Sequence, residues 1–406
     1  MTNERSTTTG VPPQTPAMPF DQQRLDAAMR AAGLDVIVAT APYDVRYLLG
    51  GYRHHYYVND DALALTRYQP IVGYVAGAPQ EAFFIGNWMD ADPLELHPIW
   101  VPDVRAESPD GRASARLLLD ALRARGLDGA AIGIEPPFLS LELYGPLGEL
   151  SGARLLDAMP VLEHLRAVKR PHELQLMRAV SERIVESMEA VYARASVGDS
   201  SLDVERWMAA EQRRRGVEFG FSFVAIGADR NRTPSLARLV PGSTLSIDSA
   251  GKIDGYIGDL ARMGVVGGPS DGQVEALAAV DAVQLAARAP LRAGATGAQL
   301  YEAATSAIAE TPYGDRLDFI AHGIGVVSHE APRLALDAPH GYAAAHRDRP
   351  LEAGMVVSIE TTLADPQLGY VKLEDTVAVT ATGCVGLGDA ARGWNIINDG
   401  ERRGTR

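Results

Sequence analysis

Apolar and polar positions in the first part of the chain switch repeatedly between a helical period and a strand period. Residues 21–32 place Leu25 and Met29 on one face and are followed by Gly33, a residue that commonly ends helices. Residues 34–40 form a short apolar run, which indicates a buried strand. The same reasoning predicts strands at 68–76, 81–86 and 130–135 and an amphipathic helix at 113–126. Helices that alternate with strands in this way predict an α/β layer around a central sheet.

A joint between two domains is predicted near residues 165–171. Pro171 suits the first turn of a helix, and a residue that precedes a proline avoids helical geometry. From there, apolar residues recur at helical spacing through 171–195 and predict one long helix with a buried stripe. Further helices are predicted at 201–216, 271–289 and 297–310, and β-rich runs at 221–227, 243–248, 256–266, 355–363 and 370–379. This part of the chain therefore predicts an α+β domain whose helices cover an antiparallel sheet.

The domain boundaries follow from these patterns. We expect a smaller α/β domain at 20–165 and a larger domain at 166–400, because 406 residues exceed what one core usually holds. Residues 1–19 are polar and rich in Thr and Pro, and they lack the apolar stretch of a signal peptide. We expect this segment to be disordered.

Composition narrows the classes of function. Apolar residues make up 46% of the chain and charged residues 22%, which is ordinary for a globular protein. The net charge of −14, without a basic stripe, disfavours a nucleic-acid groove and an anionic membrane surface. The single cysteine, Cys384, can form neither an internal disulfide nor a cysteine-based zinc site, and no apolar run reaches 18 residues. We therefore expect a cytoplasmic protein without membrane spans.

Four carboxylates lie in strands that otherwise look like core. Asp248 follows the apolar run 245–247, and Asp259 comes eleven residues later. Glu360 follows the run 356–359, and Glu374 comes directly after residues 371–373. A buried, isolated carboxylate is very costly, so such groups normally pair with another charge or bind a metal. His322 opens a glycine-containing segment, HGIGVVSHEAP, whose glycines permit close approach of the backbone.

Each of these residues also has an ordinary structural explanation. An Asp at a strand end is usually a turn former, Glu374 beside Asp375 could be an exposed acidic pair, and most core histidines satisfy a backbone carbonyl. Taken together, however, the set favours a metal site. Carboxylate oxygens with one imidazole suit manganese, iron(II), cobalt or zinc.

The order and context of these residues resemble the pita-bread metallohydrolases, which include prolidase, aminopeptidase P, methionine aminopeptidase and creatinase. The segments that carry the likeness are LSIDSAGKIDGYIGDLARM, HGIGVVSHEAP, GMVVSIE and VKLEDTVAV, and the N-terminal RLDAAMRAAGLDVIVATAPYDVRYLLG is similar to the smaller domain of the prolidase and creatinase branch. The likeness runs from about residue 22 to residue 390. It implies an α+β pita-bread catalytic domain preceded by a smaller α/β creatinase-like domain, and a homodimer.

The resemblance also implies roles for individual residues. Asp259 and Glu374 would bridge two divalent metal ions, Asp248 would chelate one of them, and His322 and Glu360 would hold the other. Manganese is the favoured metal, with cobalt, iron and zinc as alternatives. Glu360 would also act as the general base towards the attacking water, and the second histidine of its segment, His329, would donate a hydrogen bond to the oxyanion or leaving group.

Three departures from the prolyl peptidases bear on the substrate. Where those relatives have Glu-Pro-Gly, this chain has Glu360-Thr361-Thr362, and where they have an arginine two residues before the last glutamate it has Lys372. The loop at 227–238 lacks their substrate-contacting histidine and instead offers four polar residues: Arg230, Asn231, Arg232 and Arg238. We expect Lys372 and Arg232 to contact the substrate together with His329. His54 and Tyr57, from the segment RHHYYVNDD, are further candidates, because in this family the smaller domain can reach a neighbouring subunit's active site.

The leading hypothesis is a dimetal hydrolase that cleaves Xaa-Pro bonds in dipeptides or at peptide N-termini. The alternative is a specialised small-molecule hydrolase or lyase on the same scaffold, like creatinase, an ectoine hydrolase or a dimethylsulfoniopropionate lyase. The departures at Thr361 and Lys372 and the missing histidine of the loop at 227–238 favour this alternative. A metal-free interaction module explains the complete ligand set poorly.

Overall fold

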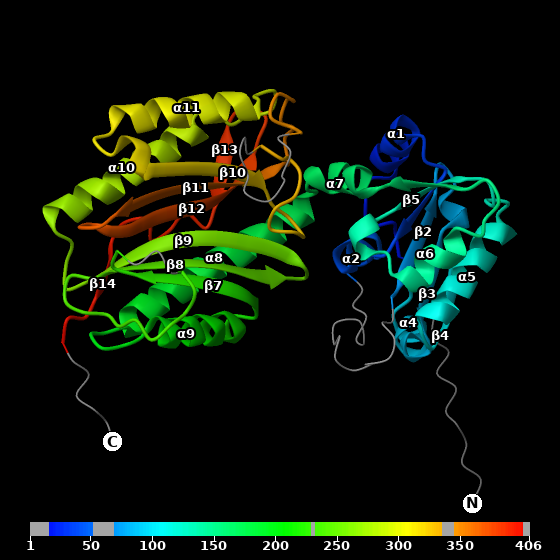
Figure 1. The fold of residues 1–406 in the computed structure, drawn as a ribbon, viewed down its shortest axis with the longest axis horizontal. Helices are drawn as coiled ribbons and strands as arrows, with labels where there is room; N and C mark the ends of the chain where they lie inside the picture. Colours follow the sequence, from blue (N-terminus) through cyan, green and yellow to red (C-terminus); the bar gives the residue numbers. More distant parts are fainter. Residues whose placement is uncertain (1–15, 52–68, 229–231, 335–344, 401–406) are drawn as a thin grey trace, which may run out of the picture. The chain divides into compact units, whose positions relative to one another are not determined.

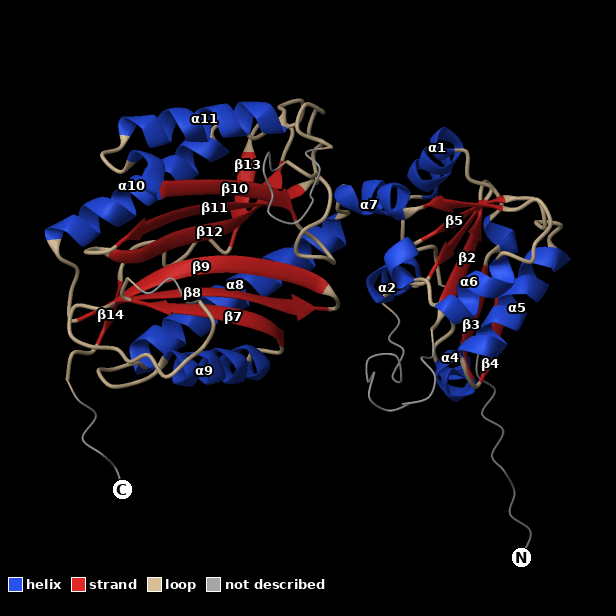
Figure 2. Cartoon of the chain, in the orientation of Figure 1, coloured by secondary structure: helices blue, strands red, loops and turns tan. Residues whose placement is uncertain are grey.

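A computed structural model of the chain describes residues 16–51, 69–228, 232–334 and 345–400. The chain divides into two compact units, Met1–Leu165 and Arg166–Arg406. Figures 1 and 2 show the elements of each unit. Most of the segment predicted to be disordered, and the segment that carries His54 and Tyr57, lie outside the described residues.

The first unit alternates helices and strands. Its elements in chain order are α1 Gln22–Ala32, β1 Val36–Ala39, α2 Pro42–Leu48, β2 Ile71–Val75, η2 Pro79–Glu81, β3 Phe83–Asn87, η3 Trp88–Asp90, α4 Ala91–Leu96, β4 Asp103–Ser108, α5 Gly111–Ala124, β5 Ala131–Ile134, η4 Pro136–Phe138, α6 Leu141–Leu147, β6 Arg154–Asp157 and α7 Met159–Ala167, which ends just past the boundary. The described strands form one six-stranded sheet in the order β4-β3-β2-β1-β5-β6. Gly33 adopts a left-handed conformation at the end of α1, as the sequence predicts. The predicted α/β layer is confirmed.

The second unit is built around a mainly antiparallel sheet, in which β14 alone of the described strands pairs parallel to its neighbour. Its elements are α8 Pro171–Arg194, α9 Ser201–Arg214, β7 Glu218–Ile226, β8 Thr244–Ile253, β9 Tyr256–Val266, α10 Asp271–Arg288, α11 Gly297–Glu310, η5 Gly314–Arg316, β10 Leu317–Gly323, β11 Val356–Asp365, β12 Gly369–Val379, β13 Cys384–Leu387 and β14 Asn395–Ile397. Six of these strands follow the order β10-β11-β12-β9-β8-β7, with β13 on β12 and β14 on β9. The predicted α+β class is confirmed for this unit.

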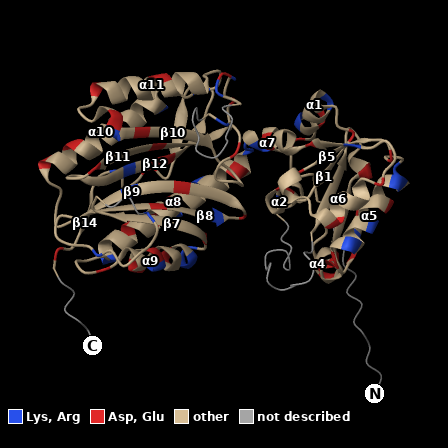
Figure 3. Cartoon of the chain, viewed as in Figure 1, with Lys and Arg blue, Asp and Glu red and all other residues tan. Residues whose placement is uncertain are grey.

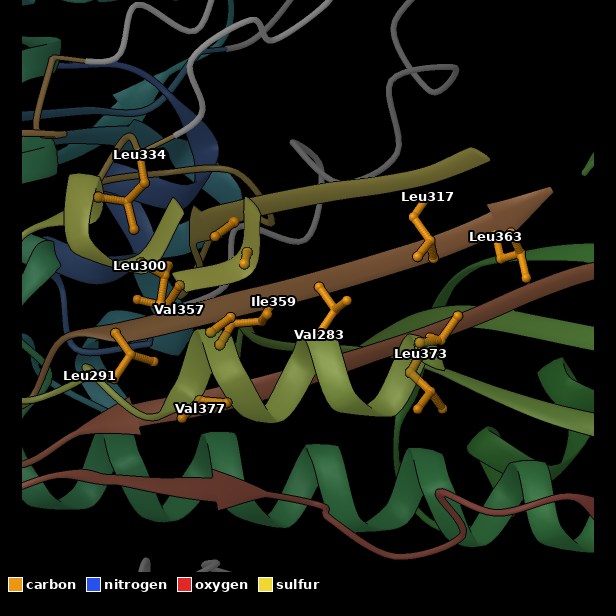
Figure 4. Packing of buried hydrophobic residues seen from close by; sticks show 14 of the residues in the cluster. Val283, Leu291, Leu300, Leu317, Leu334, Val357, Ile359, Leu363, Leu373 and Val377 are labelled. Atoms are coloured by element: carbon orange, nitrogen blue, oxygen red, sulfur yellow. The ribbon is translucent and has the colours of Figure 1, made fainter. Parts of the chain in front are cut away.

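The helices of the second unit pack on one face of this sheet. Val283 of α10 lies against Ile359 of β11 and Leu373 of β12 (Figure 4). Ile184 of α8 packs with Ile247 of β8 in a second buried cluster. Because side chains alternate along a strand, the neighbours of these core residues in sequence point to the opposite face. Alternate residues of each strand therefore face either the helix-covered core or the opposite face of the sheet, which can carry polar groups.

Charged residues on the helices are mixed in sign. Figure 3 shows basic and acidic residues together along α9, where Glu211 accepts hydrogen bonds from Arg214 and Arg215. The side chain of Arg214 is exposed, and ion pairs with exposed partners contribute little to stability. None of the helices in the described ranges combines the length and the apolar character that crossing a bilayer requires.

Candidate metal centre

The β8–β9 hairpin brings two predicted ligands to one face of the sheet. Its two turn residues, Asp254 and Gly255, both have positive φ, 48° and 88°, which is the geometry of a tight hairpin turn. The resulting register places Asp248 opposite Ala261, two positions from Asp259 on the same strand. An eleven-residue separation across a two-residue turn thus puts both carboxylates on the same face.

The remaining predicted ligands come to that face from the neighbouring strands. Glu360 of β11 lies directly opposite Glu374 of β12, and Glu374 in turn pairs with Ala261 of β9. His322 of β10 lies opposite Ser358, two positions from Glu360. Cross-strand neighbours share a face, so β8 to β12 supply all five predicted ligands to one surface. Asp248 and Glu360 lie within their strands, which continue for several residues beyond them.

The five predicted ligands and His329 form two clusters of possible ligand atoms. Asp248, Asp259 and Glu374 make one cluster, and His322, Glu360 and His329 make the other, with the ligand atoms of each cluster within 4.8 Å of one another. The first cluster is buried throughout. The structure thus brings together the residues that the sequence singled out, and the assignment of each as a ligand stays a prediction.

Two buried oxygens indicate that a cation belongs here. Among the described residues, no hydrogen-bond donor reaches Oδ1 of Asp248 or Oδ1 of Asp259. Leaving a buried carboxylate oxygen without a partner is costly, and a bound cation would satisfy both atoms. Carboxylate oxygens with imidazole nitrogens suit a divalent ion such as manganese, iron(II), cobalt or zinc. The residues therefore fit the metal that the sequence predicts.

Burial and mutual repulsion shift the pKa values of the acidic groups. Burial, and then the charge of Glu374, raises the pKa of Asp259 well above its usual value. Burial and the charge of Glu360 raise the pKa of Glu374 to about 7. For Glu360, burial acts in the same direction, but Lys372 and the hydrogen bond with His322 outweigh it and lower the pKa. The pKa values of two neighbouring glutamates thus shift in opposite directions, because Glu360 has both Lys372 and His322 as close partners while repulsion from Glu360 acts on Glu374.

Lys372 lies inside the carboxylate set. Its side chain is 2% exposed, and its Nζ lies 2.6 Å from Oδ2 of Asp248, 2.6 Å from Oε2 of Glu360 and 2.8 Å from Oε2 of Glu374. Burial would lower the pKa of Lys372, but the three carboxylates raise it well above the usual value. The side chain is therefore an ammonium. The contact with substrate expected for Lys372 stays a prediction.

Arg232 lies at the more open side of the site. Its side chain is 34% exposed and donates a hydrogen bond to Oδ2 of Asp248. Its guanidinium lies 4.6 Å from the centre of the Phe223 ring and 5.9 Å from that of Tyr370. Of the other residues predicted in this loop, Arg230 and Asn231 lie outside the described residues. Arg238 donates to the carbonyl of Gly198.

His329 stacks directly on His322. The two ring centroids are 3.8 Å apart and the ring planes are inclined by 24°, while Nδ1 of His329 lies 3.1 Å from the hydroxyl of Ser328. The next residue, Glu330, is buried and lies 2.9 Å from Nζ of Lys169. This buried ion pair anchors the segment that presents His329 to the site.

Glycines allow this segment to fold tightly, as the sequence predicts. A Cβ on Gly323 would lie 2.4 Å from the carbonyl carbon of Ala331, and a Cβ on Gly325 would lie 2.1 Å from Oε1 of Glu330. Either distance is a severe clash. The His-Gly-x-Gly pattern therefore reflects a steric requirement at the strand end that carries His322.

The face opposite the site holds a buried carboxylate that the sequence reasoning missed. Asp375 is fully buried, and its oxygens lie 3.0 Å from Arg262 and 3.2 Å from Arg288, with Arg392 as a third partner. Burial would raise the pKa of Asp375, but Arg262 and the other two arginines lower it. The alternative of an exposed acidic pair at Glu374 and Asp375 is wrong. The alternation of the strand offered the signal, because adjacent residues must face opposite sides.

Two further polar residues of β11 have distinct tasks. Ser358 donates its hydroxyl to Oε1 of Glu374 at 2.8 Å, which orients a predicted bridging ligand. Thr361 is fully buried and its hydroxyl lies 3.4 Å from Oε1 of Gln284 on α10. Thr361 therefore belongs to the helix-covered face. Its side chain does not contribute to the face that carries the candidate metal ligands, although it departs from the Glu-Pro-Gly pattern.

Comparisons with known proteins agree with this geometry. Residues 175–381 match metallopeptidase family M24, and residues 22–168 match the Creatinase/Prolidase N-terminal domain. The Xaa-Pro dipeptidase of Pyrococcus furiosus is 28% identical over 229 residues, which cover 55% of this chain and 63% of that protein. The probable dipeptidase PepE of Mycobacterium tuberculosis is 26% identical over 383 residues, which cover 89% of this chain and 92% of that protein.

A solved structure extends the likeness to the fold. The Xaa-Pro dipeptidase from Bacillus anthracis matches with a TM-score of 0.75 at 23% identity, covering 93% of this chain and 99% of that one. The two family matches follow one another along the chain and confirm the predicted order of a creatinase-like domain and a pita-bread domain. Membership implies divalent metal ions and supports a hydrolase. The chain belongs to metallopeptidase family M24.

Proposed function

We propose that this protein is a metal-dependent hydrolase that cleaves Xaa-Pro bonds in dipeptides or at peptide N-termini. The observation that carries the proposal is the gathering of five predicted ligands on one sheet face, where no described residue donates a hydrogen bond to the buried Oδ1 atoms of Asp248 and Asp259. The named activities of the dipeptidase relatives support a small peptide as the substrate.

The chemistry divides between the metal and the chain. Two divalent ions, with manganese favoured, would supply a water whose pKa is lowered towards about 7. Glu360 is positioned to accept a proton from the nucleophile, since its pKa is lowered by Lys372 and His322 and its carboxylate is ionised at neutral pH. His329, stacked on His322, is positioned to donate a hydrogen bond to the developing oxyanion or the leaving group.

Arg232 is the proposed contact for the substrate carboxylate. Its guanidinium is partly exposed and lies beside the predicted ligand Asp248. Guanidinium groups bind carboxylates through two parallel hydrogen bonds, which suits the free C-terminus of a dipeptide. Contacts of His329, Lys372, His54 and Tyr57 with substrate remain predictions from the sequence.

The alternative of a specialised small-molecule hydrolase or lyase keeps two supports, Lys372 and the absence of a histidine from the loop at 227–238. Lys372 replaces the arginine that is usual at this position in the prolyl peptidases, and a lysine lacks the planar fork with which an arginine grips a carboxylate. Thr361 no longer adds to that case, because its side chain faces α10.

Hydrolysis assays with manganese-, cobalt- or iron-loaded protein test the proposal. We expect release of the N-terminal amino acid from Ala-Pro, Leu-Pro or a longer Xaa-Pro peptide, and no turnover of creatine, ectoine or dimethylsulfoniopropionate. Glu360→Gln and His329→Ala should each lower kcat by about 100-fold or more, while His97→Ala, an exposed histidine of the first unit, should leave it unchanged. Turnover of a non-proline substrate alone would favour the alternative.

A cytoplasmic location and a homodimer are also proposed. The single cysteine supports the location, since one thiol cannot form an internal disulfide. The family resemblance supports the homodimer. Gel filtration with light scattering would measure the mass of the assembly.

A further inference from the structure

The choice of lysine at position 372 is unusual for this chain. Only three of its 38 basic residues are lysines: Lys169, Lys252 and Lys372. Lys169 is buried against Glu330, and Lys372 is buried among the predicted metal ligands. Position 372 therefore carries a compact ammonium group, whereas most basic residues of this chain are arginines with a guanidinium group.

The Lys372 ammonium contacts carboxylates from three strands at once. Its partners are Asp248 on β8, Glu360 on β11 and Glu374 on β12, all within 2.8 Å of Nζ. The ammonium is in direct contact with all three oxygens. A metal ion therefore cannot bind at this position while the ammonium group remains there. Lys372 thus has the position and the charge of a bound cation.

Two other carboxylate oxygens of the site have no such partner. Oδ1 of Asp248 and Oδ1 of Asp259 are buried and lack a donor among the described residues. The same site therefore contains one cation position that the protein fills with its own side chain, and buried oxygens elsewhere that an added ion would satisfy.

We infer that Lys372 acts as a built-in competitor for one of the two metal ions. The first divalent ion binds beside Asp248 and Asp259, where oxygens await a partner. The second ion binds only when the ammonium withdraws from Glu360 and Glu374. The two ions therefore bind in two unequal steps, and Lys372 sets the difference between them. This inference rests on the proposed function, because it concerns the same metal site.

The charge of the site supports the same conclusion. Metal binding requires the ionised forms of the carboxylates, and the four of this site, Asp248, Asp259, Glu360 and Glu374, then carry four negative charges. Lys372, Arg232 and one divalent ion together balance these charges. A second ion added to a site that still holds both side chains would leave an excess of positive charge in a buried place, which is strongly unfavourable. Withdrawal of Lys372 removes part of that excess.

Metal-binding measurements test the inference without any substrate. Metal-free wild type, Lys372→Met and the control Lys252→Met would be titrated with Mn²⁺ by isothermal calorimetry and dialysed at fixed free Mn²⁺. We expect one tightly held ion per chain in wild type and in Lys252→Met. We expect two in Lys372→Met, with the Kd of the second step lowered about tenfold or more. Two ions bound by wild type with the same constants as Lys372→Met would overturn the inference.

Lysine signals give a second measurement on the wild-type protein. With three lysines in the chain, labelling with [¹³Cε]lysine yields few ε-signals, and Lys372→Arg identifies the one from Lys372. We expect this signal to move as the second equivalent of Mg²⁺ or Zn²⁺ binds, because the ammonium leaves its carboxylates. A signal that stays constant while two ions bind would contradict the inference.

These readouts separate the two proposals. Unequal ion binding that depends on Lys372, together with no hydrolysis of Xaa-Pro substrates, would overturn only the proposed function. Hydrolysis of Xaa-Pro substrates with equal ion binding in wild type and Lys372→Met would overturn only the competitor role.

Discussion

Asp375 lies directly behind the candidate metal centre and is held by three arginines on the helix-covered face. Replacing it by asparagine would leave Arg262, which is fully buried, without its carboxylate. Removing one partner of a buried ion pair typically costs about 3–5 kcal/mol. We therefore expect Asp375→Asn to lower the free energy of unfolding by about that amount, measured by urea denaturation at neutral pH.

A control and a pH series sharpen this prediction. Asp281 also pairs with Arg392 but is 35% exposed, so Asp281→Asn should cost under about 1 kcal/mol. Because the folded-state pKa of Asp375 is lowered, its contribution is present above the unfolded pKa of about 3.9 and is lost as pH falls through the lower folded value. The difference between wild type and Asp375→Asn should therefore shrink below about pH 4. Equal losses for the two variants would contradict the buried network.

At the residue scale, the chemistry of the site was more predictable than its electrostatic balance. Carboxylates such as Asp248 and Glu360 stand out because they interrupt apolar strands. The place of Lys372 could not be deduced, because it depends on cross-strand register: β12 sets Lys372 beside Glu374 on a face that β8 and β11 also reach. The buried ion pairs of Asp375 could not be predicted, because its arginine partners come from segments far apart in the sequence.

At the element scale, the turn of the β8–β9 hairpin fixes the separation of two predicted ligands. Gly255 has a φ of 88°, which a β-branched residue adopts only with strain of about 1–3 kcal/mol. We expect Gly255→Val to lower stability by about that amount and to weaken Mn²⁺ retention during dialysis. Gly268→Val is the control, since Gly268 has open space around it and no positive φ. Full metal retention by Gly255→Val would show that the register survives without this turn.

Elements with a periodic or continuous apolar pattern were predictable, whereas some short elements without one were not. The helices that became α5, α8, α10 and α11 have repeated apolar faces, and Ser270 caps α10 through the backbone of Gln273. The short helix α4 contains Pro93, and β4 has the polar sequence DVRAES. Neither carries a periodic signal, because its structure depends on neighbouring elements of the same sheet or loop.

At the scale of the whole molecule, the predicted order of fold classes is confirmed, since an α/β unit precedes an α+β unit. The pattern of apolar and polar residues was sufficient for this result, because helices and strands alternate in the first unit while long strands that pair mainly antiparallel make up the sheet of the second. The ends of the family matches, at residues 168 and 175, bracket Pro171, the residue whose backbone restrictions predicted the joint.

Metal removal should destabilise the whole protein, and more so at higher pH. In the metal-free state, burial and neighbouring charges raise the pKa of Glu374 to about 7 and that of Asp259 well above its usual value. A carboxyl whose folded pKa is raised binds its proton more tightly when folded, so stability falls as pH rises from the unfolded value towards the folded one. A bound ion instead requires the deprotonated carboxylates and compensates their charge. We therefore expect the difference in Tm between manganese-loaded and EDTA-treated protein to grow between about pH 5 and about pH 8. A difference that is constant or shrinks over this range would mean that these carboxylates do not hold the ion.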